Sequence, residues 1–160
     1  MTRNRIRTLS LALLLAWGFT SPVGAGNAIE VDMLDRGEDG EARVFAPDVV
    51  FIEPGDRVQF EPVDLGHDVR SLDALRPEGA ESFSGFRNAP LGVQFKEEGV
   101  HVYECEAHRD RGMVGVVVVG DPSVNLEDIE AAMEDAEDLS DNGRERLSDM
   151  LARVRENSQS

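Results

Sequence analysis

Short apolar segments alternate with turn-forming residues between positions 29 and 119. Ile29, Val31 and Met33 are separated by polar residues, a two-residue period typical of a strand buried on one face. Residues 114–119 form a near-continuous apolar run, as expected of a strand buried on both faces. Further strands are predicted at 44–45, 49–52, 58–60, 93–95 and 99–105. Several short strands separated by regular turns predict an all-β sandwich.

The period becomes helical beyond residues 120–122. Two sets of apolar residues recur at helical spacing: Leu126, Ile129 and Met133, and then Leu147, Met150, Leu151 and Val154. Asn125, with Asp128 three residues on, is predicted to cap the first helix. Asn142, with Glu145 at the same spacing, resembles a second capping box. We therefore predict two helices that pack on the sandwich.

Residues 1–25 have the composition of a secretory signal peptide. Three arginines at positions 3, 5 and 7 precede an apolar run from Leu9 to Phe19, and small residues follow at 23–25. The run is shorter than the about 20 residues that span a membrane, so a membrane anchor is the less favoured alternative. The remaining residues predict one domain, a sandwich over 26–121 with a helical extension over 122–160.

The chain is strongly acidic. It has 16 Lys and Arg against 32 Asp and Glu, a net charge of −16, and without residues 1–25 the charge becomes −19. Nucleic acid and anionic membranes are disfavoured as partners, because phosphate binding needs a surplus of basic residues. Salt relieves the self-repulsion of such a surface, so its acidity suggests salty surroundings.

Cys105 is the only cysteine in the chain, so no internal disulfide can form. In an oxidising compartment an unpaired thiol is a liability unless something occupies it. A buried, inert cysteine is the plain alternative. The residues that follow Cys105 favour a metal site instead.

Three sulfur and nitrogen ligands occur in one predicted loop. The segment Cys105-Glu-Ala-His108-Arg-Asp-Arg-Gly-Met113 lies between a strand that ends at Cys105 and the apolar strand after Met113. His67 is the fourth candidate, because a sandwich brings loops from different parts of the chain together at one end. Taken singly, Met113 could fill the core and either histidine could be a surface residue. His101 is predicted to be a surface or packing residue outside the site.

The ligand types identify the metal. Two imidazoles and one thiolate with a weak thioether describe a type 1 (blue) copper site. Zinc gains little from methionine, and calcium and magnesium prefer oxygen ligands. A ligand set that suits both Cu(II) and Cu(I) rearranges little when an electron moves. We therefore predict that His67, Cys105, His108 and Met113 bind one copper ion in an electron carrier that is not an enzyme.

Two other functions fit the same residues less well. A copper storage or delivery protein would use an open site that releases its metal, whereas these mixed ligands suit retention. A structural domain with a vestigial site would not keep all four ligands. An oxidase would need further redox centres that so short a chain lacks.

These residues resemble the pseudoazurins, a family within the cupredoxins. The resemblance runs through Glu53-Pro-Gly-Asp, Pro62-Val-Asp-Leu-Gly-His67, the loop 105–113 and Asn125-Leu-Glu-Asp-Ile, and so covers nearly all of the chain after residue 25. It implies a Greek-key sandwich of about eight strands with two C-terminal helices packed on it, and copper under one end.

The resemblance also implies a role. It implies a monomeric periplasmic electron carrier whose redox partners are copper nitrite reductase, nitrous oxide reductase or cytochrome c. It implies that electrons pass through the edge of His108, inside a docking patch that includes Ala107, Met113 and Pro90.

Three departures from the pseudoazurin pattern concern the site. Ala107 stands where proline is usual, and its N–H is predicted to point at the Cys105 sulfur and raise the reduction potential. Asp68 replaces the usual asparagine, and a buried carboxylate there is expected to carry a desolvation cost. Glu104 and Glu106 flank the cysteine, in place of the lysines that surround the docking patch in many relatives.

Overall fold

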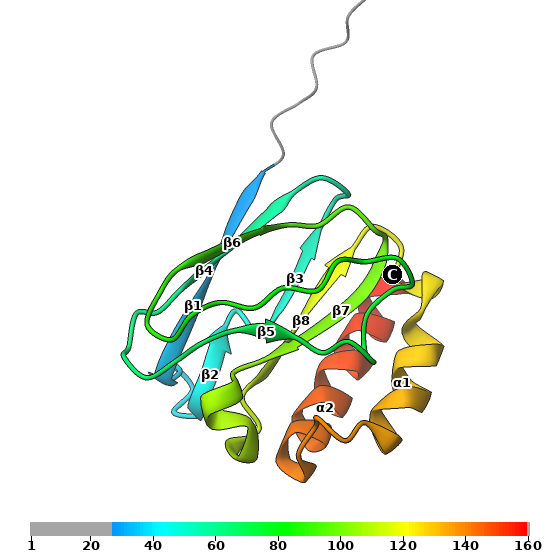
Figure 1. The fold of residues 1–160 in the computed structure, drawn as a ribbon. Helices are drawn as coiled ribbons and strands as arrows, with labels where there is room; N and C mark the ends of the chain where they lie inside the picture. The colour runs from blue at the N-terminus through cyan, green and yellow to red at the C-terminus, as the bar shows by residue number, and fades with distance from the viewer. Residues whose placement is uncertain (1–26, 160) are drawn as a thin grey trace, which may run out of the picture.

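Two four-stranded sheets face each other in the computed structural model, which describes residues 27–159 (Figure 1). The predicted signal peptide at residues 1–25 lies outside the described residues. Two C-terminal helices lie against one of the sheets, so the predicted fold class is confirmed. Within residues 27–159 no helix is long and apolar enough to cross a membrane.

The strands of each sheet come from distant parts of the chain. The first sheet has the order β2 (Ala42–Ala46), β1 (Ala28–Arg36), β4 (Arg57–Glu61) and β6 (Leu91–Gln94). The second has the order β3 (Val49–Ile52), β8 (Val114–Val119), β7 (Gly99–Glu104) and β5 (Arg70–Ser71). The pairs β1–β4 and β3–β8 are parallel and the other pairs are antiparallel. The connections therefore pass repeatedly between the sheets, as in a Greek-key sandwich.

The core between the sheets follows the alternation in the sequence. Val31 and Met33 of β1 are fully buried, as are Val58 and Phe60 of β4. The Tyr103 ring lies at the centre of this core, with its centroid 4.9 Å from that of Phe60. Burial of these apolar faces is the main favourable contribution to folding.

Strand β8 takes part in two hydrophobic cores. Val117 and Val119 belong to the cluster between the sheets, whereas Val114, Val116 and Val118 belong to a second cluster under the helices. This double burial accounts for the unbroken apolar run in the sequence.

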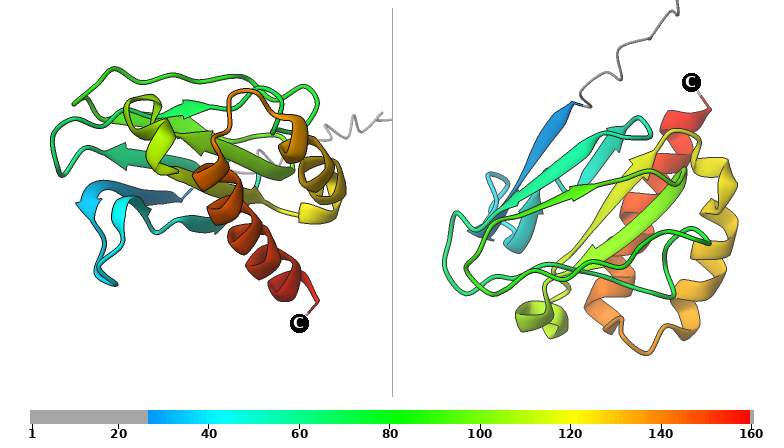
Figure 2. Two further views of the ribbon diagram at one scale, coloured as in Figure 1. Left: turned by 90° about the horizontal axis from the view of Figure 1, so that it is seen from below. Right: turned by 45° about the horizontal axis from the view of Figure 1, so that its top comes forward.

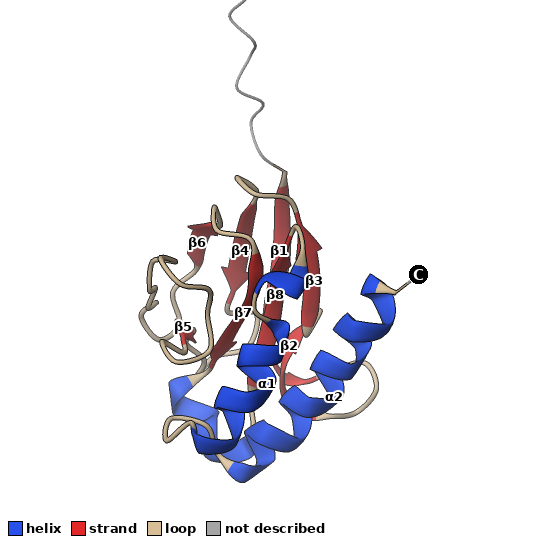
Figure 3. Cartoon of the chain, turned by 90° about the vertical axis from the view of Figure 1, so that its right-hand side faces the viewer, coloured by secondary structure: helices blue, strands red, loops and turns tan. Residues whose placement is uncertain are grey.

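Helices α1 (Leu126–Asp135) and α2 (Asp141–Ser158) cover the outer face of the second sheet (Figures 2 and 3). Two short 3₁₀ helices, η1 (Glu106–Arg111) and η2 (Pro122–Val124), precede and follow β8. The apolar positions predicted for the two helices are all buried, so this prediction is confirmed.

Both capping predictions are wrong in their side-chain contacts. Asn125 occupies the N-cap position of α1, but its side chain makes no capping bond. Its Oδ1 accepts from the Val100 N–H at 2.7 Å, and its Nδ2 donates to the Val100 carbonyl at 3.0 Å. Ser140 rather than Asn142 caps α2, through a bond from the Gly143 N–H to its Oγ at 3.1 Å. Both asparagines instead hold other segments of the chain.

We predict that Asn125→Ala lowers the free energy of unfolding by roughly 2 kcal/mol, because it leaves two buried backbone groups of Val100 without partners. Urea unfolding of the two proteins measures the difference. Asn157→Ala, at an exposed position of α2, is the control and should change stability by less than about 0.5 kcal/mol. Equal effects of the two substitutions would contradict the role of Asn125.

His101 gives a prediction for the dependence of stability on pH. It is buried, its ring packs on Phe95 with centroids 5.0 Å apart, and its Nε2 donates to the Glu97 carbonyl at 2.8 Å. Burial lowers the pKa of His101 below its usual value. The folded protein therefore binds the proton less well than the unfolded chain, and stability is lost as the pH falls below about 6.5. His101→Gln should flatten the slope of stability against pH below about 6.5, and an unchanged slope would contradict this.

Candidate metal centre

Three of the four predicted ligands meet at one end of the sandwich. His67 lies between β4 and β5, Cys105 directly follows β7, and His108 lies in η1. The Nδ1 atoms of His108 and His67 lie 3.5 and 4.0 Å from the Cys105 sulfur. One ligand atom from each residue lies within 4.8 Å of the other two, so the three side chains can hold one metal ion.

Met113 lies at the other end of the loop, directly before β8. It is fully buried and packs in the same hydrophobic cluster as Cys105. The Cys105 N–H donates to the Met113 carbonyl at 2.9 Å, and the Met113 N–H donates to the His108 carbonyl at 3.3 Å. These backbone bonds close the loop. That the Met113 sulfur binds the metal as a fourth ligand stays a prediction.

The protonation equilibria of the three side chains depend on their burial. Burial raises the pKa of the Cys105 thiol to about 11, although the backbone N–H groups of Asp68 and His108 favour the thiolate. Burial, and then positive charges such as that of Arg43, lower the pKa of His67 and His108. Neutral imidazoles keep a lone pair for a metal, and a bound cation compensates the charge of a thiolate in this pocket.

The second ring nitrogen of His67 contacts a carboxylate. His67 Nε2 lies 3.1 Å from Asp35 Oδ1 on β1, and Asp35 forms an ion pair with Arg43 on β2. The Asp35 N–H donates to Asp64 Oδ2 at 2.7 Å. A hydrogen bond from Nε2 fixes the tautomer and leaves Nδ1 available for a metal. No spacing in the sequence relates Asp35 to His67, and sequence analysis missed it.

Asp68 joins the two ligand-bearing segments. Its buried carboxylate accepts from the Glu106 N–H at 2.7 Å and from the Ala107 N–H at 3.4 Å, and its Oδ2 lies 3.5 Å from Arg87. These contacts offset the expected desolvation cost. The prediction that the Ala107 N–H points at the Cys105 sulfur is wrong, because this group donates to Asp68. The rise in reduction potential was expected from that bond to sulfur, so the structure gives no reason for it.

A third segment supports His67. The Gly66 N–H donates to Asn88 Oδ1 at 2.5 Å, and the Asn88 N–H donates to the His67 carbonyl at 2.8 Å. Gly66 has a φ of +103°, and a Cβ on it would lie 4.0 Å from His108 Cε1. The chain therefore turns tightly beside the edge of His108. The sequence signal for this support was the Asn88-Ala-Pro turn, and sequence analysis missed it.

Glu104 is not a surface residue, contrary to its expected place beside the docking patch. Its side chain is fully buried, and Oε1 accepts from Arg70 at 2.7 Å and from Arg109 at 3.1 Å. Burial raises its pKa despite the two arginines. Alternation along β7 turns this side chain away from that of Cys105. Only Glu106 of the two acids is exposed.

The surface around His108 differs in part from the expected patch. Met113 is fully buried and so cannot belong to it, whereas Ala107 is half-buried and Pro90 is exposed. The large apolar side chains exposed on the segments that hold His67 and Asn88 are Val63, Leu65 and Phe86, at 59%, 77% and 87%. His101 lies outside the group formed by His67, Cys105 and His108.

Comparison with known proteins gives consistent results. Residues 31–120 match the plastocyanin/azurin family of copper-binding proteins. The pseudoazurin of Paracoccus pantotrophus is 39% identical over 125 residues, which cover 78% of this chain and 82% of that protein. The crystal structure of pseudoazurin from Methylobacterium extorquens AM1 superposes with a TM-score of 0.72 at 33% identity, covering 80% of this chain and 99% of the other. Pseudoazurin from Hyphomicrobium denitrificans gives 0.70 at 30% identity, with coverages of 79% and 97%.

The matched region contains all four candidate ligands and both sheets from Val31 onward. The donor set at the end of the sandwich, with two imidazoles and a cysteine sulfur, fits a single copper ion. The chain therefore belongs to the plastocyanin/azurin family and, within it, to the pseudoazurins, which are blue-copper electron-transfer proteins and not enzymes.

Proposed function

We propose that His67, Cys105, His108 and Met113 bind the copper ion and that the protein carries single electrons between periplasmic redox proteins. The observation that carries this proposal is the convergence of His67, Cys105 and His108, whose ligand atoms lie within 4.8 Å of one another. Copper supplies the redox change, cycling between Cu(II) and Cu(I). The protein fixes the ligands and excludes water from most of them.

The surrounding bonds favour a site that stays rigid during electron transfer. Asp68 ties the segment of His67 to the turn after Cys105, and Asn88 supports the His67 backbone. Because these contacts lie outside the ligand atoms, they do not depend on the oxidation state of the metal. A site that is held in one geometry needs little rearrangement when the electron arrives or leaves.

The half-buried ring of His108 is the proposed route for electrons. Ala107 directly precedes His108, and Pro90, Leu65 and Phe86 are apolar residues exposed on the segments that hold His67 and Asn88. A small apolar patch suits a brief encounter with a redox partner better than a stable complex. Copper nitrite reductase, nitrous oxide reductase and cytochrome c are the proposed partner classes, with this protein acting as a monomer.

The proposed location follows from the first 25 residues. Their basic start, apolar run and small-residue cleavage site are those of a secretory signal peptide. Export would place Cys105 in an oxidising compartment, where binding of copper protects the thiol from oxidation. The mature protein would then begin close to β1.

The colour of the copper-loaded protein tests the proposed bond between copper and Cys105. The protein loaded with Cu(II) should be intensely blue or green and should bleach with ascorbate, and Cys105→Ser should abolish the colour because the absorption belongs to the copper–sulfur bond. Visible absorption spectroscopy measures both. His101→Gln, outside the group of candidate ligands, should keep the colour. A colourless protein that binds Cu(I) and loses it readily to a chelator would indicate copper delivery instead.

The reduction potential tests the support that Asp35 gives to His67. Asp35→Asn keeps a hydrogen-bond acceptor for His67 Nε2 but removes the negative charge, which makes the imidazole a weaker donor to Cu(II). The reduction potential should rise, by less than about 59 mV because Asp35 is half exposed and its charge is screened by solvent. Voltammetry measures the shift. Asp39→Asn in the β1–β2 turn makes the same change of charge, and an equal shift there would refute a specific effect of Asp35.

A further inference from the structure

The start of α2 lies against the loop that carries Cys105, His108 and Met113. Three backbone carbonyls of this loop accept bonds from α2 or its cap: Arg109 from Ser140 Oγ at 2.7 Å, Asp110 from Asn142 Nδ2 at 2.8 Å, and Gly112 from Arg146 Nη1 at 3.1 Å. Figure 1 shows the orange start of α2 beside the short helix η1. The helix therefore holds the loop by its backbone, whatever side chains the loop carries.

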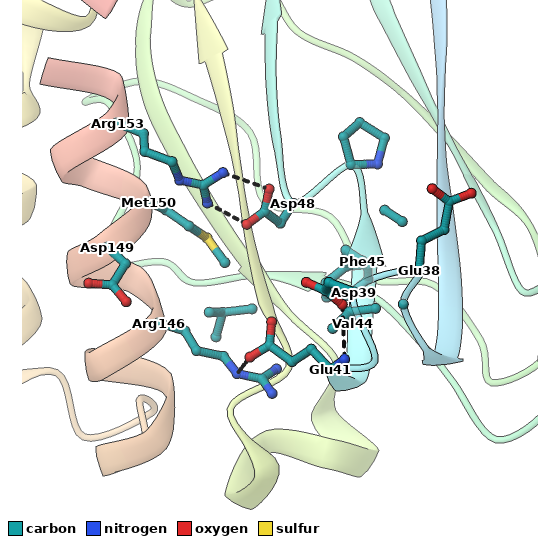
Figure 4. A pocket seen from close by; sticks show the side chains of 14 residues that line it. Glu38, Asp39, Glu41, Val44, Phe45, Asp48, Arg146, Asp149, Met150 and Arg153 are labelled. Carbon is teal, nitrogen blue, oxygen red and sulfur yellow. Dashed lines mark hydrogen bonds and ion pairs between the residues drawn. The ribbon is translucent and has the colours of Figure 1, made fainter. Parts of the chain in front are cut away.

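Arg146 reaches a second part of the molecule. Its Nη1 also donates to the Arg43 carbonyl at 2.9 Å, its Nη2 donates to the Ala42 carbonyl at 3.0 Å, and its Nε pairs with Glu41 at 3.0 Å. Figure 4 shows this guanidinium between α2 and the segment that enters β2. One planar group thus bridges Gly112 and the first residues of β2, a geometry that several fixed donors make possible.

Both ends of this bridge lead to candidate copper ligands. Gly112 directly precedes Met113. Arg43 forms the ion pair with Asp35, whose carboxylate contacts Nε2 of His67. A shift of Arg146 would therefore be transmitted to the ligand loop and to the support of His67 together.

The loop and α2 approach each other closely at Gly112. A Cβ on Gly112 would lie 2.7 Å from the carbonyl carbon of Asn142 and 2.8 Å from its oxygen. The start of α2 thus blocks movement of Gly112 in that direction. Since α2 is anchored by its own buried face, which includes Leu147 and Leu151, it is a rigid support.

We propose that α2 is a clamp for the copper-ligand loop and that Arg146 is its central positioning residue, which sets the placement of Met113 relative to the copper. This proposal rests on the proposed function. Loss of the Arg146 bonds frees the carbonyls of Gly112 and Arg43 while the hydrophobic face of α2 stays packed. The interaction of the thioether with copper, and with it the electronic structure of the copper–sulfur bond, then changes.

The test compares two arginines of the same helix in the full, copper-loaded protein. Arg146→Gln should change the intensity ratio of the sulfur-to-copper absorption bands, the EPR splitting of Cu(II) and the reduction potential. Arg153→Gln is the matched control, because Arg153 pairs with Asp48 two turns further along α2 and does not contact the loop (Figure 4). It should leave all three readouts at their original values. Arg146→Lys keeps the charge, but its single amino group cannot reach all these acceptors at once. Its three readouts should therefore also differ from those of the unmodified protein.

Unchanged spectra and potential in Arg146→Gln, or equal changes in both variants, would overturn the clamp. If Arg146→Gln does not fold, Asn142→Ala decides, since it removes only the bond to Asp110 and should also change the intensity ratio of the bands. An unchanged ratio in that variant would likewise overturn the clamp. Failure of the proposed function has a different signature, because the unmodified protein would then lack the intense copper–sulfur absorption.

Discussion

The antiparallel pairing of β7 with β8 is the constraint on which the candidate copper site depends. Glu104 pairs with Val114, so the nine residues between them must form a closed loop at the end of the sandwich. This register places Cys105 and Met113 opposite each other and brings their backbones within hydrogen-bond distance. His108 lies between them on η1. The positions of three candidate ligands thus follow from one strand pairing, and only His67 has to be brought in from elsewhere.

Features with local causes were predictable from the sequence. The alternation in β1, the two-sided burial of β8 and the apolar faces of both helices reflect side-chain periodicity, and all are confirmed. The convergence of His67 with Cys105 and His108 was predictable because the ligand types are rare in combination. Asp35 and Arg146 could not be found in this way, since their contacts with His67 and Gly112 depend on tertiary packing. The two asparagines failed as caps for the same reason: distant backbone groups compete for their amides.

Three basic residues of this acidic protein connect separate segments of the fold. Arg70 and Arg109 converge on the buried Glu104, and Arg146 binds backbone carbonyls from two segments. Arginine suits this use because its fixed fork of donors can satisfy several acceptors at once. Among the arginines on the segments that carry or support the candidate ligands, Arg87 and Arg111 are exposed.

The membership of β8 in two hydrophobic clusters has a consequence for motion. A segment buried from both sides opens only when the whole molecule opens, so its amide hydrogens should exchange at the slowest rates in the protein. Met113 is attached directly to this segment, whereas the ring of His108 lies at the boundary with solvent. The Met113 thioether is therefore attached to the most rigid strand of the protein. The His108 imidazole, through which an electron would leave, lies at the surface.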